Sequence, residues 1–218
     1  LQGSTTAANN TGTNNTALGH SSLRNITSGS YNVAIGGPGV TGGALYSNTT
    51  GSSNIAIGSD ALAANISGTG NTAIGNNALH ASTTVNYNTA VGYSALYSNT
   101  SGASNAAFGN DTLSSNTTGG YNLAFGPYAL NANTTGSYNA AMGGLGANTV
   151  GNNNTALGLG ALSSNVAKSE STAVGYNAMY YAHNTAVGAI TYITSVAAFA
   201  LQGSTTAANN TGTNNTAL

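Results

Sequence analysis

The chain of 218 residues carries almost no charge: only 2% of its residues are charged, the formal net charge is −1, and there is no Cys. Nucleic-acid binding through phosphate neutralisation needs clustered Lys and Arg, and this sequence has only Arg24 and Lys168. Acidic calcium loops need several carboxylates, of which only Asp60, Asp111 and Glu170 exist, and the lack of Cys excludes disulfides and thiolate metal sites. No apolar run approaches the roughly 18 residues that cross a bilayer.

A short phrase, Asn-Thr-Ala-φ-Gly with φ an apolar residue, recurs along the chain, as at 15–19, 71–75 and 88–92. Most copies are separated by one common interval, that from Gly75 to Gly92, and a degenerate copy is expected at 196–200, with Ala200 in the place of Gly. Self-similarity at a fixed period is the signature of a repeat architecture and argues against a disordered chain. The Gly residues of the phrase are Gly19, Gly36, Gly58, Gly75, Gly92, Gly109, Gly126, Gly143, Gly158, Gly175 and Gly188.

The interval from Gly36 to Gly58 is the longest between motif Gly residues. Leu45 and Leu96 stand in matching phrases, and they lie equally far before the motif Gly that follows each of them. The extra residues of the long interval are therefore those at 37–41, where Pro and Gly predict a looped-out insertion.

A second, larger repeat is superimposed on the first. Residues 201–218 repeat residues 1–18 letter for letter, which sets a period of 200 residues for twelve expected coils. We interpret 1–218 as a single repetitive segment, and we expect it to come from a longer protein built of tandem blocks. A duplication introduced during cloning is the alternative.

A period of 17 residues suits one coil of a β-solenoid and is too short for helix-pair repeats, which need roughly 33 to 47 residues. Asn, Thr, Gly and Ser are poor residues for helix interiors, and turn residues follow each phrase. The sequence therefore predicts an all-β fold, a parallel β-solenoid of about twelve coils.

Side chains alternate along each predicted strand, so φ lies on one face while Ala and Gly lie on the other. The second face is expected to be smooth, so that another backbone or chain can approach it closely. We predict that φ forms the main core rank, which comprises Leu18, Ile35, Ile57, Ile74, Val91, Phe108, Phe125, Met142, Leu157, Val174 and Val187. A second core rank is predicted four residues after the motif Gly, at Leu23, Leu62, Leu79, Leu96, Leu113, Leu130, Leu162 and Met179.

Asn stands four residues before almost every motif Gly. Stacked at the strand spacing of about 4.7–4.9 Å, these side chains are expected to form a ladder in which each amide bonds the next. Like charges stacked at that spacing would repel one another in every coil, which accounts for the use of neutral groups. The predicted ladder consists of Asn15, Asn32, Asn54, Asn71, Asn88, Asn105, Asn122, Asn139, Asn154 and Asn184.

Phrases such as those at 32–36, 54–58 and 71–75 resemble the head repeats of trimeric autotransporter adhesins of the YadA type and related repeats of phage tail fibres. The resemblance covers about residues 14–200 of the chain. It implies a left-handed parallel β-roll, three chains side by side, and a place on a bacterial surface or a phage fibre. It implies adhesion and not catalysis.

Few side chains suggest a reactive site. His20, His80 and His183 fall at different positions of their coils, so we expect no metal site, and we expect Asp60 and Asp111 to be surface residues. No Ser-His-Asp set can be argued from the register. We therefore expect neither enzymatic activity nor a cofactor.

The 12 Tyr residues leave two interpretations open. They pack at the corners of the coils, or they form exposed rows suited to carbohydrate or surface binding. One group directly precedes the ladder Asn: Tyr31, Tyr87, Tyr121 and Tyr138. Another follows the second core rank: Tyr46, Tyr97 and Tyr180.

Two further patterns come from Asn and Thr. Sequons for N-glycosylation fall on the predicted turns, where a glycan is tolerated. They include Asn48, Asn65, Asn99, Asn116 and Asn133. A Thr rank resembles the Thr arrays of ice-binding solenoids, but it shares the φ face and is expected to lie inward or half-buried. It comprises Thr16, Thr72, Thr89, Thr155, Thr172 and Thr185.

These patterns favour a structural and adhesive fibre segment that is extracellular, at a cell surface or part of a phage fibre. Its expected partners are copies of itself, in a homotrimer or a head-to-tail filament, and host or environmental surface glycans or proteins. The alternative is a structural protein that forms filaments by end-to-end stacking, and ice binding is a remote alternative. No nucleic-acid partner and no membrane span are expected in this segment.

Overall fold

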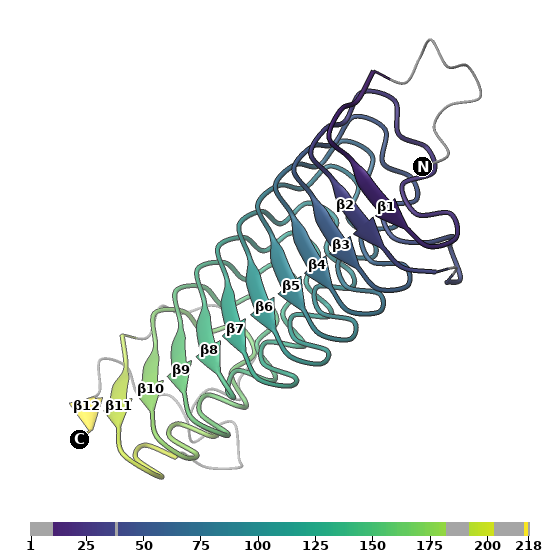
Figure 1. The fold of residues 1–218 in the computed structure, drawn as a ribbon. Coiled ribbons are helices and arrows are strands. Elements are labelled where there is room, and N and C mark those ends of the chain that lie inside the picture. Colours follow the sequence, from purple (N-terminus) through teal and green to yellow (C-terminus); the bar gives the residue numbers. More distant parts are fainter. Residues whose placement is uncertain (1–10, 38, 182–191, 203–215, 218) are drawn as a thin grey trace.

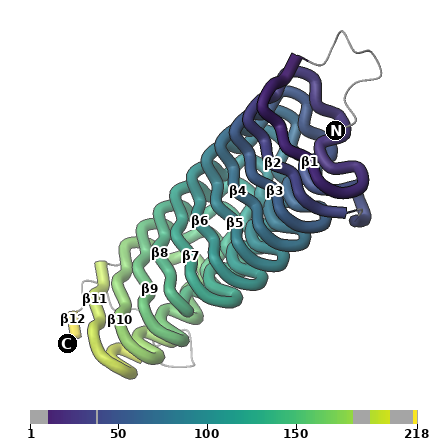
Figure 2. Tube along the Cα trace, viewed as in Figure 1, coloured from purple at the N-terminus to yellow at the C-terminus, as the bar shows by residue number. Residues whose placement is uncertain are grey.

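The computed structural model describes residues 11–37, 39–181, 192–202 and 216–217, which form one elongated stack of coils (Figure 1, Figure 2). Each coil contributes one short strand, and the 12 strands form a single parallel sheet in sequence order. The predicted all-β parallel solenoid is confirmed, and the described residues contain no helix. The strands are β1 (Thr16–Leu18), β2 (Val33–Ile35), β3 (Ile55–Ile57), β4 (Thr72–Ile74), β5 (Thr89–Val91), β6 (Ala106–Phe108), β7 (Leu123–Phe125), β8 (Ala140–Met142), β9 (Thr155–Leu157), β10 (Thr172–Val174), β11 (Thr194–Val196) and β12 (Thr216–Ala217).

Identical positions of the repeat lie opposite one another in neighbouring coils. Ala90 of β5 pairs with Ala107 of β6, and Ala107 pairs with Ala124 of β7. The stacking continues on the far side of the coil, where the backbone N–H of Leu96 donates to the carbonyl of Thr112 at 3.0 Å. Hydrogen bonds between coils therefore hold the backbone well beyond the short strands.

A motif Gly follows most of the strands, and at several of these positions a larger residue would not fit. Gly92 has a φ of 140°, and a Cβ at this position would collide with the carbonyl oxygen of Gly109 in the next coil. Only Gly tolerates both this backbone conformation and this close approach.

The predicted insertion is confirmed in place, in the coil between β2 and β3. The backbone N–H of Leu45 donates to the carbonyl of Ala61 at 3.0 Å, so the common register is regained by Leu45. Among the extra residues, Val40 has its side chain 99% exposed.

The C-terminal coils differ from the predicted register. The phrase at 184–188 lies outside the described residues, and β10 pairs directly with β11, with Val174 opposite Val196. The predicted copy at 196–200 is therefore wrong: Ala197, and not Ala200, takes the place of the motif Gly, and its N–H donates to the carbonyl of Val174 at 3.0 Å. The phrase at 184–188 follows Gly175 so closely that the interval between them is shorter than any coil that the described strands form.

This register also changes the number of coils in the 200-residue block. Thr16 of β1 and Thr216 of β12 hold equivalent positions in the repeat. In the sheet that the described residues form, eleven strand-to-strand steps separate them, one fewer than the twelve coils expected.

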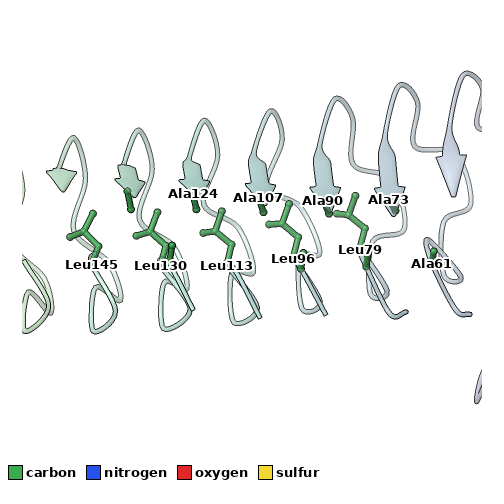
Figure 3. Close-up of a cluster of buried hydrophobic side chains, with 14 of the residues drawn as sticks. Ala61, Ala73, Leu79, Ala90, Leu96, Ala107, Leu113, Ala124, Leu130 and Leu145 are labelled. Carbon is green, nitrogen blue, oxygen red and sulfur yellow. The ribbon is translucent and has the colours of Figure 1, made fainter. Parts of the chain in front are cut away.

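The interior is filled from two opposite walls, as Figure 3 shows. The strand wall contributes its central Ala, and the opposite wall contributes the Leu that lies four residues after the motif Gly in the regular coils. This central Ala is buried in each of the strands β2 to β10, at Ala34, Ala56, Ala73, Ala90, Ala107, Ala124, Ala141, Ala156 and Ala173. The predicted second core rank is confirmed, because Leu23, Leu62, Leu79, Leu96, Leu113, Leu130, Leu162 and Met179 are all fully buried.

The predicted main core rank is wrong. Its members lie on the outside of the sheet, where Leu18 is 66% exposed and Met142 is 53% exposed. The Leu side chains of the opposite wall occupy the narrow interior, so the strand has room inside only for the methyl group of Ala. The exposed members are Leu18, Ile74, Phe125, Met142 and Leu157, the half-buried ones are Ile35, Ile57, Val91, Phe108 and Val174, and Val187 lies outside the described residues.

The core Leu residues have a left-handed backbone conformation in every regular coil, with a φ of 53° at both Leu96 and Leu113. For a residue other than Gly this conformation costs on the order of 1–3 kcal/mol. Full burial of a Leu side chain contributes about 1.5–3 kcal/mol, which offsets this cost. The tight backbone turn is thus tolerated because it directs the side chain into the core.

The predicted Asn ladder is confirmed from Asn15 to Asn154, and its last expected member, Asn184, lies outside the described residues. Asn122 is typical of the buried members. Its backbone N–H and its Nδ2 both donate to Oδ1 of Asn105, at 2.9 and 3.1 Å, and its Nδ2 also donates to the carbonyl of Gly136 at 2.9 Å. The ladder therefore joins neighbouring coils and also holds the turn of the next coil.

A second buried Asn ladder was not predicted. Nδ2 of Asn116 donates to Oδ1 of Asn99 at 3.1 Å and to the carbonyl of Gly119 at 2.9 Å. The sequence does contain its signal, since Asn recurs seven residues after the motif Gly in most of the regular coils. Its fully buried members are Asn48, Asn65, Asn99, Asn116, Asn133, Asn148 and Asn165.

Candidate functional site

The most extensive unusual surface is the outward side of the sheet, which we call the outer strand face. It is made by the first and third residues of strands β1 to β11, and none of them is charged. Large apolar side chains remain open to solvent on it, with Leu123 44% exposed and Leu157 42% exposed. Parallel sheets are normally covered on both faces, and exposed apolar patches of this extent mark interaction sites.

The middle of the outer strand face carries a stacked aromatic pair. The ring centroids of Phe108 and Phe125 lie 4.4 Å apart with an interplanar angle of 15°. The parallel register produces this stack, because it places equal positions of β6 and β7 opposite each other. The pair forms a ridge of aromatic surface that a partner can cover.

The Thr rank lies on this same outer face and does not point inward. Thr72, Thr89 and Thr172 are half-buried, as expected, but Thr16 and Thr155 are exposed, and Thr185 lies outside the described residues. Ile55 and Leu123 interrupt the rank, and the neighbouring rank carries the bulky Phe and Met side chains. The face is therefore an apolar surface with interspersed Thr and not a continuous flat Thr array.

The Tyr residues before the ladder Asn are exposed and do not pack into corners. Tyr31, Tyr87, Tyr121 and Tyr138 are 57–69% exposed. Tyr121 and Tyr138 stack with ring centroids 5.0 Å apart and an interplanar angle of 2°. The other group is less open: Tyr97 is 39% exposed, while Tyr46 and Tyr180 are half-buried.

The sequon Asn residues are members of the second buried ladder, so the expectation of tolerated glycans on these turns is wrong. Asn48, Asn65, Asn99, Asn116 and Asn133 are fully buried. In each of them Nδ2, the atom that would carry a glycan, donates hydrogen bonds inside the solenoid. A glycan at these positions is incompatible with the folded coil.

The titratable residues do not assemble into a metal site within the part of the chain that the structure describes. His20 contacts Ser21, whose Oγ lies 3.0 Å from Nδ1, and His80 stacks on Tyr97 with ring centroids 5.0 Å apart. His183 lies outside the described residues. Asp111 is half-buried and accepts a hydrogen bond from Asn110 at 2.8 Å.

Asp60 is only 1% exposed, so the expectation of a surface residue is wrong. Its carboxylate holds the inserted loop, accepting hydrogen bonds from Thr41 Oγ1 at 2.8 Å and from the backbone N–H groups of Thr41 and Gly42. Burial raises the pKa of Asp60, but the hydrogen bonds from Thr41, Val40 and Gly42 outweigh it and set the pKa below its ordinary value. The insertion is thus anchored by a buried, ionised carboxylate.

Comparisons with known proteins give no indication of what the chain does. No protein-family model, no curated protein and no solved structure matches the chain at a significant level. Along the described ranges, the structure holds no helix with the length and apolar character to cross a membrane.

Proposed function

We propose that this chain is a segment of an extracellular structural and adhesive fibre, in which solenoids pack side by side through the outer strand face. The observation that carries the proposal is the exposure of two uncharged ranks, rich in large apolar side chains, on the same side of the sheet from β1 to β11. Covering such a surface removes apolar area from water, which is worth about 25 cal/mol per Å².

The periodicity of the outer strand face favours a second copy of the chain as its partner. Apolar side chains recur on it at the strand spacing of about 4.7–4.9 Å over the length of the stack. Another solenoid of the same chain has the same spacing, so its side chains can interdigitate along the whole face and not at one point only. The stack of uncharged coils also avoids electrostatic repulsion between copies packed in register.

The resemblance to YadA-like head repeats supports three chains abreast as the stoichiometry and a cell surface or phage fibre as the location. The same resemblance supports adhesion to surface glycans or proteins as the purpose of the fibre. The low charge and the regular stack are consistent with a rod that holds binding surfaces away from its base.

Light scattering of the purified chain tests the lateral packing. The wild type is expected to be an oligomer, and the double variant Phe108→Ser/Phe125→Ser is expected to dissociate at least 10-fold more readily because it removes the aromatic ridge. Tyr97→Ser, on the wall opposite the strands, is the matched control and leaves the assembly unchanged. A monomeric wild type at all concentrations, or equal assembly of all three proteins, contradicts the proposal.

End-to-end stacking remains a second candidate, and one observation favours it. Thr216–Ala217 has the same sequence as Thr16–Ala17, and it pairs in parallel with β11 as the last strand of the sheet. A following block would therefore continue the same sheet, and an open terminal strand is a template for such growth. In this arrangement the variants of Phe108 and Phe125 leave the assembly intact.

A further inference from the structure

The coil between β8 and β9 is two residues shorter than its neighbours, and this shortening opens a notch in the wall of the solenoid. The interval from Gly143 to Gly158 falls short of the regular one, such as that from Gly126 to Gly143. The backbone N–H of Leu145 donates to the carbonyl of Ala161 at 3.0 Å, as in the regular coils, so the missing residues are those between Gly143 and the core Leu. The place that Pro127 and Tyr128 occupy one coil earlier is empty here.

The resulting notch has a volume of about 360 Å³ and is walled by aromatic side chains. Tyr128 lines one side and Tyr176 and Tyr180 line the other, and Tyr128 and Tyr176 are 56% and 50% exposed. The walls belong to coils three steps apart, which at the strand spacing is about 14 Å along the stack.

Between these walls the lining is rich in Gly. Gly143, Gly144, Gly146 and Gly160 leave backbone polar groups close to any molecule that enters, and Leu159 adds one exposed apolar side chain. Asn177 and Ser163 add an amide and a hydroxyl to the lining, and no charged residue takes part.

These features point to a neutral ligand with one apolar face and many hydroxyl groups. Tyr rings combine apolar faces with a polar tip, which suits the C–H face of a pyranose ring and its hydroxyl rim. The amide of Asn177, the hydroxyl of Ser163 and the backbone of the Gly residues supply donors and acceptors for those hydroxyls. The volume lies at the lower end of small-ligand sites, about 300–1,000 Å³, and suits one or two sugar rings.

We propose that this notch is a binding site for a neutral pyranose saccharide. The proposal deepens the adhesive part of the proposed function and rests on it for its biological use. Binding itself is measurable on the chain whatever its state of assembly.

Saturation-transfer NMR and calorimetry with glucose, galactose, mannose, N-acetylglucosamine and their β1,4-linked disaccharides test the site. At least one of these sugars is expected to bind the wild type, and Tyr128→Ala and Tyr176→Ala are each expected to weaken that binding by at least 10-fold. Tyr87→Ala removes an exposed Tyr outside the notch and leaves the affinity unchanged.

An insertion variant tests the notch itself. Two Asn residues inserted after Gly143 copy the regular coil at Asn76–Asn77, restore the regular length and fill the gap, and they are expected to abolish binding. Circular dichroism confirms that this variant is folded. Absence of binding by every sugar, or binding that survives the insertion or both Tyr substitutions, overturns the proposal. Light scattering on the same samples reports fibre assembly separately, so a failed saccharide site does not count against the fibre.

Discussion

Asn65 and Ser82 occupy the same position in neighbouring coils, and the second buried ladder is interrupted between them. Nδ2 of Asn65 donates to Oδ1 of Asn48 at 2.9 Å, but Oδ1 of Asn65 accepts no hydrogen bond. It is the single buried side-chain polar atom in the described part of the chain without a partner. Oγ of Ser82 donates instead to the carbonyl of Asn99 at 2.9 Å.

The interruption has a steric cause three residues further along. Val85 stands where most coils have Gly, and its side chain is buried. In a regular coil, a Cβ on the equivalent Gly51 would collide with Oδ1 of Asn48. A Cβ alone does not exclude the amide, because Lys168 holds the equivalent position and Nδ2 of Asn165 still donates to Oδ1 of Asn148 at 3.2 Å. The β-branched side chain of Val85 distinguishes its coil, and we interpret Ser82 and Val85 as a matched pair that replaces the usual Asn and Gly.

A double-mutant cycle tests this coupling. Ser82→Asn alone is expected to destabilise the fold because Val85 blocks the amide, and Val85→Gly alone loses buried apolar area. Combined, they restore the ladder bonds to Asn65 and Asn99, so the double variant is expected to be more stable than the sum of the single effects by about 1–2 kcal/mol. Thermal and urea unfolding provide the free energies, and strictly additive effects would contradict the matched pair.

Gly92→Ala is expected to destabilise the solenoid by about 2 kcal/mol or more, because the Cβ meets the carbonyl of Gly109 and the φ of 140° is strained for Ala. Gly37→Ala is the control, since a Cβ at Gly37 has no atom within 4 Å. Chemical unfolding compares the two. Equal stability of both variants would show that the motif Gly is not required by the close stacking of the coils.

Asn122→Asp tests why the chain has so little charge. The carboxylate would lie against Oδ1 of Asn105 and the carbonyl of Gly136, so its pKa is expected to rise, and the variant loses at least about 2 kcal/mol at neutral pH. The penalty for the charge is fully present above the raised pKa of the folded state, shrinks as the pH falls from there toward the ordinary Asp pKa of about 3.9, and is absent below that value. Asn25→Asp is the exposed control, and unfolding at pH 3 and pH 7 measures both. A deficit that is the same at the two pH values would refute the electrostatic explanation.

The inserted loop is expected to loosen in acid. Because the pKa of Asp60 lies below its ordinary value, its contribution to stability is fully present above the ordinary value and is lost as the pH falls through the lower one. Hydrogen exchange at the amides of Thr41 and Gly42 should therefore accelerate at low pH relative to the strand amides. In Asp60→Asn the exchange should be fast throughout, and a wild-type loop that stays protected under acid would argue against this anchor.

Spacing alone was sufficient to predict the solenoid, the Leu rank and the first Asn ladder. Leu113 and Asn122 recur at fixed offsets from the motif Gly, and any structure that stacks the coils in register must stack these residues as well. These predictions needed only the repeat period, which can be read directly from the sequence.

Spacing alone could not predict which side of the strand faces inward. Alternation separates Ala107 from Phe108, but the inside is decided by the width of the interior, which depends on Leu113 reaching across from the opposite wall. The size rule, that the larger side chain is buried, fails because that space is already filled. The prediction that the sequon Asn residues tolerate glycans was wrong for a related reason. Asn116 stands in a sequence typical of an exposed turn, but its side chain is buried and hydrogen-bonded inside the solenoid.

The repeat phrase alone could not predict the register of the C-terminal coils. In β11 the residue at the ladder position is Ile193 and the residue at the Gly position is Ala197, so neither motif residue marks the strand. The phrase at 184–188, which does carry the motif, lies outside the described residues.

The number and orientation of chains in a fibre cross-section, determined by electron cryomicroscopy, test the central claim most directly. Lateral packing predicts several chains abreast, three by the resemblance to adhesin heads, with the outer strand faces of β1 to β11 turned toward one another and the Phe108–Phe125 ridge covered. A cross-section that holds a single chain, with the outer strand face open to solvent, would contradict the account.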